Sequence, residues 1–390
     1  MSKGNKAHRS LFDMMGFIED PRSKRNRVYS IQQLLTVIVM GYLAGKNDFA
    51  SIERWLRDNA DFVKKMVHLP DGRIPSHDTM SRICRMTRPL EVITVLGCWL
   101  AEEIPSFAKK RLAIDGKALN GVRGDGRSPV MLNVYSPWYR MFLLHYNIPE
   151  KKGEPTSLPE LLEFLTLKDV MVTIDAAGTH PNIIGKILSA GGHIILPVKD
   201  NNKNLNADLR LYMKDMMNSR DPRVKKHYEY DNGHGRNVKQ TIFVINGNEA
   251  VMDERFKDLV GSVALMVRER CGSEPESELK EEICYICDRD GISAKEFFDE
   301  IRAHWGIENN LHNALDTVFF EDKNGTTKDN GPANVSFLRK TALNFISAIY
   351  MKEKGRLPYQ RIRDILGRNP EKMEEFIKGN MLQSIVLEAK

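Results

Sequence analysis

The sequence predicts an α/β protein in which a mixed sheet with covered faces follows an all-helical N-terminal segment. Residues 28–105 carry apolar side chains at helical spacing. From residue 110 onward, short apolar runs alternate with helical patterns, which indicates a mixed sheet with helices on its faces. Residues 206–290 are more polar and contain several further strand candidates, which predicts a mostly β insertion.

Composition excludes several classes of protein. Hydrophobic residues make up 42% and charged residues 28% of the 390 positions, which fits a globular chain of two or three domains and excludes disorder. The longest apolar run, 31–44, is shorter than the roughly 20 residues of a membrane span, so we expect a buried helix there. The polar N-terminus lacks a secretory core, and five irregularly spaced cysteines favour a reducing compartment. We therefore expect a cytoplasmic protein.

The charge is modest and uneven. The 58 basic and 52 acidic residues give a net charge of +6. Residues 1–27 hold seven Lys and Arg against three acidic residues, a local excess of +4. A basic arm is typical of a protein that binds a polyanion, but a solvated tail has the same composition.

The N-terminal segment predicts short helices joined by tight turns. Ser30 is a candidate cap for a helix that runs through Gly45, and residues 51–66 are amphipathic. After a Pro-Asp-Gly turn, Ser76 is a candidate cap for a helix over 78–86. Such helices beside a basic arm fit either a DNA-binding bundle or a plain helical cap.

The remaining elements follow in a regular order. Strands are predicted over 111–115, 129–136, 139–147, 169–175 and 193–199, with helices over 158–165 and 181–190. The insertion contributes strands over 240–246, 262–267 and 282–287, and helical patterns cover 294–319 and 335–390, the latter broken at Pro358 and Pro370. We expect a helical domain over 1–105, a sheet core over 106–205, the insertion over 206–292, core-completing helices over 293–350 and a helical segment over 351–390.

Two aspartates stand where predicted strands end. Asp115 and Asp175 each follow an apolar run directly, and ligands of open α/β sheets gather at the carboxyl ends of strands. Two carboxylates on neighbouring strands repel each other unless a cation lies between them, and Mg²⁺ or Mn²⁺ prefers oxygen ligands. Aspartate is also common in turns, so the pair is more informative than either residue alone. Cys284 and Cys287 form a single CxxC inside a predicted strand, which is not a zinc-site pattern.

The last predicted helices carry further polar groups. His304, Glu308 and His312 recur at i, i+4 and i+8, which places them on one face of a continuous helix. The two histidines would then be about 12 Å apart, too far to bind one zinc ion, so a carboxylate facing the sheet edge is favoured.

Two turn sequences also fit polyanion contacts. A Gly-rich turn at 232–236 presents His234 and Arg236, and Lys199 to Asn202 follows a strand. Ordinary turn chemistry explains both equally well.

In this order and spacing the motifs resemble those of a known family. They are Asp20-Pro-Arg22, Ile74-Pro-Ser-His-Asp-Thr79, Ile114-Asp-Gly-Lys117, Thr173-Ile-Asp-Ala176, His234-Gly-Arg236, His304-Trp-Gly-Ile-Glu-Asn309, Leu315-Asp316 and Glu321-Asp322. Almost end to end, the chain resembles the H-repeat-associated (ISAs-type) DDE transposases of bacterial insertion sequences.

The resemblance implies a ribonuclease-H-like core in which Asp115, Asp175 and Glu308 are catalytic and hold two Mg²⁺ or Mn²⁺ ions. It implies cleavage at transposon ends and strand transfer into target DNA, with one metal activating water or a 3′-hydroxyl and the other stabilising the leaving oxygen. The implied partners are double-stranded DNA and further copies of the chain, with no membrane, and the implied location is the bacterial nucleoid when DNA is bound. The candidate DNA-binding residues are Lys117, Lys199, Asn202, His234, Arg236, Arg302, His304, Asn309 and His312.

Two segments depart from the family pattern. Lys152-Gly-Glu-Pro-Thr156 stands where relatives usually carry Lys-Ser-Asn-Glu, and Lys199-Asp-Asn-Asn202 stands where Lys-Gly-Asn-Gln is common. Neither change removes a candidate metal ligand. Two alternatives stay open: a nuclease of the same fold that does not rejoin DNA, and a non-catalytic DNA-binding protein derived from a transposase.

Overall fold

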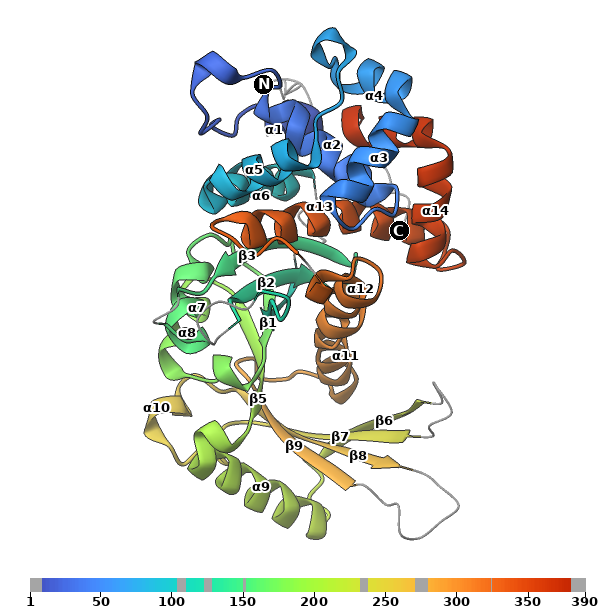
Figure 1. The fold of residues 1–390 in the computed structure, drawn as a ribbon. Helices are drawn as coiled ribbons and strands as arrows, with labels where there is room; N and C mark the ends of the chain where they lie inside the picture. Colours follow the sequence, from blue (N-terminus) through green and yellow to red (C-terminus); the bar gives the residue numbers. More distant parts are fainter. Residues whose placement is uncertain are drawn as a thin grey trace, which may run out of the picture. The chain divides into compact units, whose positions relative to one another are not determined.

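The structure is a computed structural model that describes residues 9–103, 110–122, 128–149, 152–231, 238–270, 280–323 and 325–379. The chain forms two compact units. Unit 1 comprises Met1–Lys109, Gly116–Ile148 and Glu308–Lys390, and unit 2 comprises Lys110–Asp115 and Pro149–Ile307. Figure 1 shows the ribbon coloured along the sequence. Each unit is described by itself.

The strands belong to a nine-stranded sheet in the order β3-β2-β1-β4-β5-β9-β8-β7-β6. Their bounds are Arg111–Ala118 (β1), Val130–Ser136 (β2), Met141–Asn147 (β3), Met171–Ile174 (β4), His193–Val198 (β5), Lys225–Asp231 (β6), Val238–Asn246 (β7), Ser262–Arg270 (β8) and Lys280–Cys287 (β9). In unit 2, β1 is parallel to β4 and β4 to β5, whereas the pairs from β5 through β9, β8 and β7 to β6 are antiparallel. In unit 1, β2 and β3 are antiparallel.

These strands confirm the predicted fold class. A mixed sheet follows the N-terminal helices. In the sequence, four antiparallel strands, β6 to β9, lie between β5 and the helix that begins at Ala294, and they extend the sheet beyond β5. The ribonuclease-H-like architecture with a β-rich insertion is therefore confirmed. The finer domain boundaries stay predictions.

Unit 1 is mainly helical. Its helices are α1 (Leu11–Met15), α2 (Ile31–Leu43), α3 (Phe49–Asp58), α4 (Ala60–Val67), α5 (His77–Met86), α6 (Pro89–Glu103), α12 (Asn313–Thr317), α13 (Gly331–Lys352), α14 (Tyr359–Arg368) and α15 (Glu374–Lys378), with 3₁₀ turns η1 (Lys24–Asn26), η2 (Pro70–Gly72), η9 (Glu321–Lys323) and η10 (Pro370–Met373). The predicted cap is confirmed, because the Ser30 side chain accepts a hydrogen bond from the backbone of Gln33 at the start of α2. Most of α2 is buried, and it packs against α13. Among the described residues, no helix combines the length and apolarity that a bilayer crossing requires.

Unit 2 surrounds its strands with helices. They are α7 (Glu154–Leu162), α8 (Pro181–Ser189), α9 (Lys203–Asn218), α10 (Glu254–Lys257) and α11 (Ala294–His304), with 3₁₀ turns η4 (Ala176–Gly178) and η5 (Asp200–Asn202). Helix α11 packs on β4 to β7, and α9 packs on β8 and β9. In Figure 1 these two helices lie on opposite sides of the β6–β9 strands.

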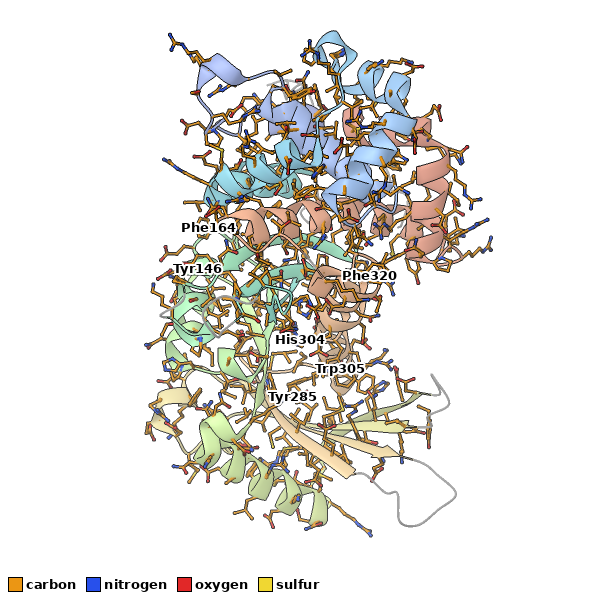
Figure 2. The ribbon with its side chains drawn as sticks, viewed as in Figure 1. Tyr146, Phe164, Tyr285, His304, Trp305 and Phe320 are labelled. Carbon is orange, nitrogen blue, oxygen red and sulfur yellow. The ribbon has the colours of Figure 1, made fainter. Side chains whose placement is uncertain are left out.

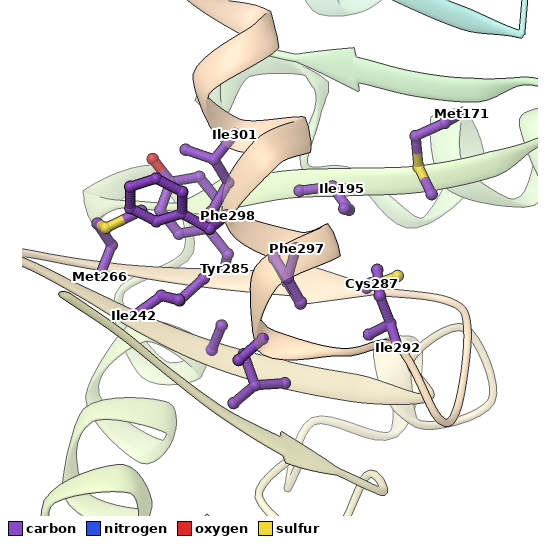
Figure 3. Packing of buried hydrophobic residues seen from close by; sticks show 13 residues of the cluster. Met171, Ile195, Ile242, Met266, Tyr285, Cys287, Ile292, Phe297, Phe298 and Ile301 are labelled. Atoms are coloured by element: carbon purple, nitrogen blue, oxygen red, sulfur yellow. The ribbon is translucent and has the colours of Figure 1, made fainter. Parts of the chain in front are cut away.

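The core of unit 2 lies between α11 and the sheet. Phe297, Phe298 and Ile301 of α11 meet buried side chains such as Ile242 and Met266 of the β insertion (Figure 3). All of these residues are at most 2% exposed. Because the cluster joins β4, β5 and the insertion to one helix, it fixes the strands whose ends carry the candidate site.

Residues 206–290 are less purely β than predicted. Sixteen residues, Lys203–Asn218, form α9, whose buried positions include Leu205, Leu209, Met213 and Met216 at helical spacing. Many polar residues between these positions hide the apolar stripe in the sequence. Strand β6 was not predicted either, because its exposed and partly buried side chains carry almost no apolar signal.

Two predicted continuous helices are interrupted. The helix over 51–66 divides into α3 and α4 at Asn59, whose backbone leaves the helical region. The helical stretch over 294–319 divides into α11, the π-helix η8 (Ile307–His312) and α12. Gly306, which lowers helix stability, lies between α11 and η8.

Replacing Phe298 by alanine should destabilise unit 2. The Phe298 ring is fully buried and meets the His227 ring edge-on with centroids 5.1 Å apart, so truncation leaves a cavity. We expect Phe298→Ala to lower the free energy of unfolding by about 3–5 kcal/mol in urea titrations. Leu211→Ala, on a side chain that is 74% exposed in α9, should change it by less than about 0.5 kcal/mol. Similar losses in both variants would contradict the assigned packing.

Candidate functional site

Two carboxylates lie level with each other on neighbouring parallel strands of unit 2, Asp115 within β1 and Asp175 directly after β4. Ile114 of β1 pairs with Ile174 of β4, so Asp115 and Asp175 come next at the same level of the sheet. Paired strands lie about 4.8 Å apart, which sets the approximate spacing of the two backbone positions. Both aspartates are partly buried. Asp175 directly follows β4, as predicted, whereas the prediction that Asp115 ends its strand is wrong, because β1 continues to Ala118.

The Asp175 carboxylate is held in place by the turn that it begins. Asp175 caps η4, and its Oδ1 accepts a hydrogen bond of 3.0 Å from the Ala177 backbone N–H. Burial raises the pKa of Asp175, although this hydrogen bond and the Lys199 ammonium act in the opposite direction. Burial and the nearby Asp175 carboxylate also raise the pKa of Glu154, at the start of α7. For Glu154 and Asp175, burial is the largest influence on the pKa.

Two side-chain amides of η5, the turn after β5, form hydrogen bonds with the backbone at η4, the turn that Asp175 begins. The Asn202 side chain donates to the Thr179 carbonyl at 2.7 Å, and the Asn201 side chain donates to the Ala176 carbonyl at 2.6 Å. Lys199, directly after β5, is exposed. The segment from Lys199 to Asn202 therefore supplies structural amides and a cation beside Asp175.

His304, labelled in Figure 2, is the last residue of α11 in unit 2. Its Nδ1 is 2.9 Å from Oγ1 of buried Thr173, and that hydroxyl donates to the Leu112 carbonyl at 3.3 Å. Burial, with Lys199 acting in the same direction, lowers the pKa of His304 to about 4. The imidazole is therefore neutral at pH 7. Through the Thr173 hydroxyl it links α11 to β4 and β1.

Glu308 lies on the π-helix η8, in unit 1. Its side chain and that of Asn309 are exposed. The prediction that His304, Glu308 and His312 share one face of a continuous α-helix is wrong, because α11 ends at His304 and the π-helix changes the angular spacing of the residues that follow. π-helices are rare and occur frequently at functional sites.

His312 and Lys117 belong to a polar network in unit 1. Lys117 is buried on β1, and its ammonium forms hydrogen bonds of 2.7 and 2.8 Å with the two carboxylate oxygens of Asp316. Burial nevertheless raises the pKa of Asp316. His312 Nε2 is 3.2 Å from Nδ2 of Asn133, a fully buried residue of β2.

A buried lysine completes this network. The Lys340 ammonium, on α13, donates to Asn133 Oδ1 at 2.6 Å and to His145 Nδ1 at 3.1 Å. Burial lowers the pKa of Lys340 to about 8, and burial and Lys340 together lower the pKa of His145 well below its ordinary value. A neutral His145 thus serves as the acceptor, and the network joins α13 to the end of η8 through Asn133.

The other candidate residues are placed as follows. Arg302 donates to a carboxylate oxygen of Glu229 at 2.9 Å, within unit 2. His234 and Arg236 lie outside the described residues. Cys284 and Cys287 are buried in β9, which confirms the strand prediction, and burial raises their pKa values to about 11 and about 12. In the basic arm, Arg22 and Arg27 both pair with Asp20, so part of its charge is balanced locally.

Sequence reasoning missed Thr173, Asn133 and Lys340. Each is a buried polar residue, Thr173 and Asn133 among apolar neighbours of a strand and Lys340 in a helix with several other buried polar residues. That contrast was the available signal, since buried polar groups require partners. It does not reveal which partner each group has.

The two aspartates suit a hard divalent cation as part of a ligand set, because both offer carboxylate oxygens. Among the described residues, no three His, Cys, Asp or Glu side chains form a group that could bind a metal ion. Asp115 and Asp175 could supply two ligands of such a set, which would need at least one more.

Comparison with known proteins gives two family matches. Residues 131–345 match the family described as "Transposase DDE domain", and residues 12–100 match the family described as "DDE_Tnp_1-associated". Together these matches cover most of the described chain, and they agree with the family resemblance read from the motifs.

Relatives in Escherichia coli span most of the chain. "H repeat-associated putative transposase YhhI" of strain K12 is 26% identical over 346 residues, which is 87% of this chain and 90% of that protein. "Putative transposase YncI" of O157:H7 is 29% identical over 351 residues, 86% of this chain and 87% of that protein. A chain of the solved piggyBac transposase synaptic complex with hairpin DNA has a TM-score of 0.45 and 11% identity over 97% of this chain and 80% of that one.

His304 should make unit 2 less stable as the pH falls. The pKa of His304 is about 4 in the folded chain and has its ordinary value of 6.5 in the unfolded chain. Between pH 6.5 and 4 the unfolded chain therefore binds more protons, so the free energy of unfolding decreases as the pH drops through this range. We expect the free energy of unfolding of the wild type to fall by at least about 1 kcal/mol more than that of His304→Gln over this range.

His77 provides a control of opposite sign. Its hydrogen bond with Glu53 raises the pKa of His77, so its contribution to stability is present at low pH and is lost as pH rises through the folded pKa. Identical pH profiles for the wild type, His304→Gln and His77→Gln would contradict both assignments.

Removing Asn133 should destabilise unit 1. Asn133→Ala leaves the buried Lys340 ammonium without its shortest acceptor, and we expect a loss of about 2–4 kcal/mol in chemical unfolding. Adding Lys340→Met to this variant removes the unsatisfied charge and should restore part of the stability. Asn120→Ala, on an exposed amide, is the matched control. No recovery in the double variant would count against the network.

Proposed function

Because the chain belongs to the transposase DDE domain family, we propose that it is a DNA transposase that cleaves transposon ends and joins them to target DNA. The observation that carries the proposal is the level placement of Asp115, on β1, and Asp175, directly after the parallel strand β4. Phosphoryl transfer to and from DNA requires charge stabilisation at such a position, and two carboxylates there fit divalent cations.

We assign the metal-binding role to Asp115, Asp175 and Glu308, with two Mg²⁺ or Mn²⁺ ions. Asp115 and Asp175 come from β1 and from the residue after β4, and Glu308 is assigned from its motif, His304-Trp-Gly-Ile-Glu-Asn309. When bound, such ions activate the attacking oxygen and stabilise the leaving one. The raised pKa of Asp175 supports this assignment, because a buried carboxylate gains most from a cationic ligand.

Other residues of the chain orient these carboxylates and contact DNA. The η4 turn and its amide donors hold Asp175, and neutral His304 braces the strands through Thr173. Exposed Lys199 and Asn309 are suited to contact phosphate or sugar oxygens directly. Lys117 and Arg302 already contact carboxylates, so we assign them a role in holding the surrounding structure.

The proposed substrate is double-stranded DNA, bound by more than one copy of the chain in the bacterial nucleoid. Cleavage of both ends of an element and their joining to a target require coordinated active sites, which two or more copies of the chain would supply.

Neutralising any of the three carboxylates should abolish metal-dependent cleavage. We expect Asp115→Asn, Asp175→Asn and Glu308→Gln each to reduce nicking of supercoiled plasmid with Mg²⁺ or Mn²⁺ by about a hundredfold or more, because each removes charge from the metal ligands. DNA binding should be largely retained. Asp258→Asn, on an exposed carboxylate of unit 2, should nick as the wild type does.

The outcomes separate the alternatives. Nicking with no strand-transfer product would favour a nuclease of the same fold. A folded wild type that binds its own element ends without cleaving them would favour a DNA-binding protein derived from a transposase. Equal loss of DNA binding in all three variants would contradict the assigned site.

A further inference from the structure

The β insertion of unit 2 has one face that its helices cover only in part. Residues paired across antiparallel strands point to the same face, so Lys226, Tyr228 and Tyr230 of β6 share a face with Phe243, Thr241 and Lys239 of β7. On this face α9 packs against β8 and β9. The opposite face holds the core under α11, where His227 meets Phe298.

Two tyrosines stand exposed at the uncovered edge. Tyr228 is 50% and Tyr230 is 54% exposed, although aromatic side chains this large are usually more buried. Their rings are perpendicular, with centroids 6.0 Å apart. Two neighbouring aromatic rings on the edge strand of a sheet offer a surface on which flat, unstacked groups can pack.

Lysines surround these rings. The Lys239 ammonium is 5.5 Å and the Lys226 ammonium is 5.9 Å from the centroid of the Tyr228 ring. Within the part of the chain that the structure describes, neither lysine forms an ion pair with a carboxylate. Their charges are thus available to an anion that approaches the tyrosines.

A groove continues from the lysines toward α9. It has a volume of about 340 Å³, its floor includes Thr241, Phe243 and Val267, and its α9 wall includes Lys214. The groove also contains Glu269 and Glu282. Glu282 is balanced by Lys214 at 2.8 Å and Arg210 at 3.3 Å. With Lys226 and Lys239, the groove lining holds three lysines against two carboxylates, and Arg210 beside it pairs with Glu282.

We propose that this face, defined by Lys226, Tyr228, Tyr230, Lys239 and the groove beside α9, binds single-stranded DNA. Bases stack on the two tyrosines, and the adjoining phosphates contact Lys226 and Lys239. Aromatic rings flanked by cations are the combination that binds unpaired strands with little dependence on sequence. A duplex is disfavoured, because its bases are already stacked on one another.

The inference rests on the proposed function, since cleavage of transposon ends is the step that would produce unpaired DNA. It adds a binding surface for that DNA away from Asp115 and Asp175. These two carboxylates repel phosphate without metal, whereas this surface needs no metal. The two proposals can therefore be tested separately.

The test is equilibrium binding of the full chain to a fluorescent single strand of about 16 nucleotides, measured by anisotropy with EDTA present. We expect the double variant Tyr228→Ala/Tyr230→Ala to bind at least about tenfold more weakly, since stacking of each base is worth roughly 1–3 kcal/mol. Tyr228→Phe/Tyr230→Phe keeps both rings and should bind as the wild type does. Phe164→Ala, at an aromatic residue that is 54% exposed elsewhere in unit 2, is the matched control and should have no effect.

The lysines are tested through salt dependence. Lys226→Gln and Lys239→Gln should each lower the slope of log K against log salt by about 0.7 for a single strand. Lys257→Gln, at an exposed lysine that pairs with Glu254, should leave the slope unchanged. An unchanged slope in Lys226→Gln and Lys239→Gln would overturn the phosphate contacts.

Three results would overturn the tyrosine assignment: wild-type affinity in the alanine variant, equal weakening by the alanine and phenylalanine variants, or equal weakening for duplex and single strand. If the wild type nicks plasmid but these tyrosines do not affect single-strand binding, this inference alone fails. If the tyrosines matter but the wild type shows no metal-dependent cleavage, the proposed function fails and this surface remains.

Discussion

The parallel pairing of β1 with β4 is the constraint on which the candidate site depends. Parallel neighbours end at the same edge of a sheet, so the register of Ile114 with Ile174 brings Asp115 and Asp175 to one level. A shift by one residue would turn one of these side chains to the other face. The register is maintained by buried side chains on both strands and by Thr173, whose hydroxyl donates to the β1 backbone.

Both units contain buried ionisable groups, and in each unit one of them is a histidine that burial keeps neutral. In unit 2 burial keeps His304 uncharged beside Thr173. In unit 1 burial keeps His145 uncharged, so that it can accept a hydrogen bond from Lys340. Protonation of His145 would remove this acceptor, and protonation of either ring would bury a charge. The neutral form of each histidine therefore stabilises its unit.

Most of the architecture could be predicted, because its signals are local. Apolar runs defined β1, β4 and β5, and Ser30 and Ser76 defined helix starts through their side-chain caps. The elements that were missed, α9 and β6, are rich in polar residues, which mask the apolar stripe of α9 and leave β6 with almost no apolar signal.

The aspartates of the site could be predicted because they directly follow strong strand signals. Their supports could not, because they depend on contacts between distant segments: His304 reaches Thr173 across 131 positions, and Lys340 reaches Asn133 across 207. The π-helix was missed for another reason. Its residues have ordinary helical composition, and nothing local separates a turn closed at i+5 from one closed at i+4.

That wide turn allows the segment around Glu308 to change length by one residue. A turn closed at i+5 holds one residue more than a turn closed at i+4, so a single deletion within Ile307–His312 that closed it into ordinary α-helix would leave the direction of α12 nearly unchanged. Asp316 would then stay beside Lys117, whereas the side chains within the turn, including Glu308, would change direction. In natural relatives we therefore expect changes of one residue in length to be tolerated within this turn more often than in the helices on either side of it.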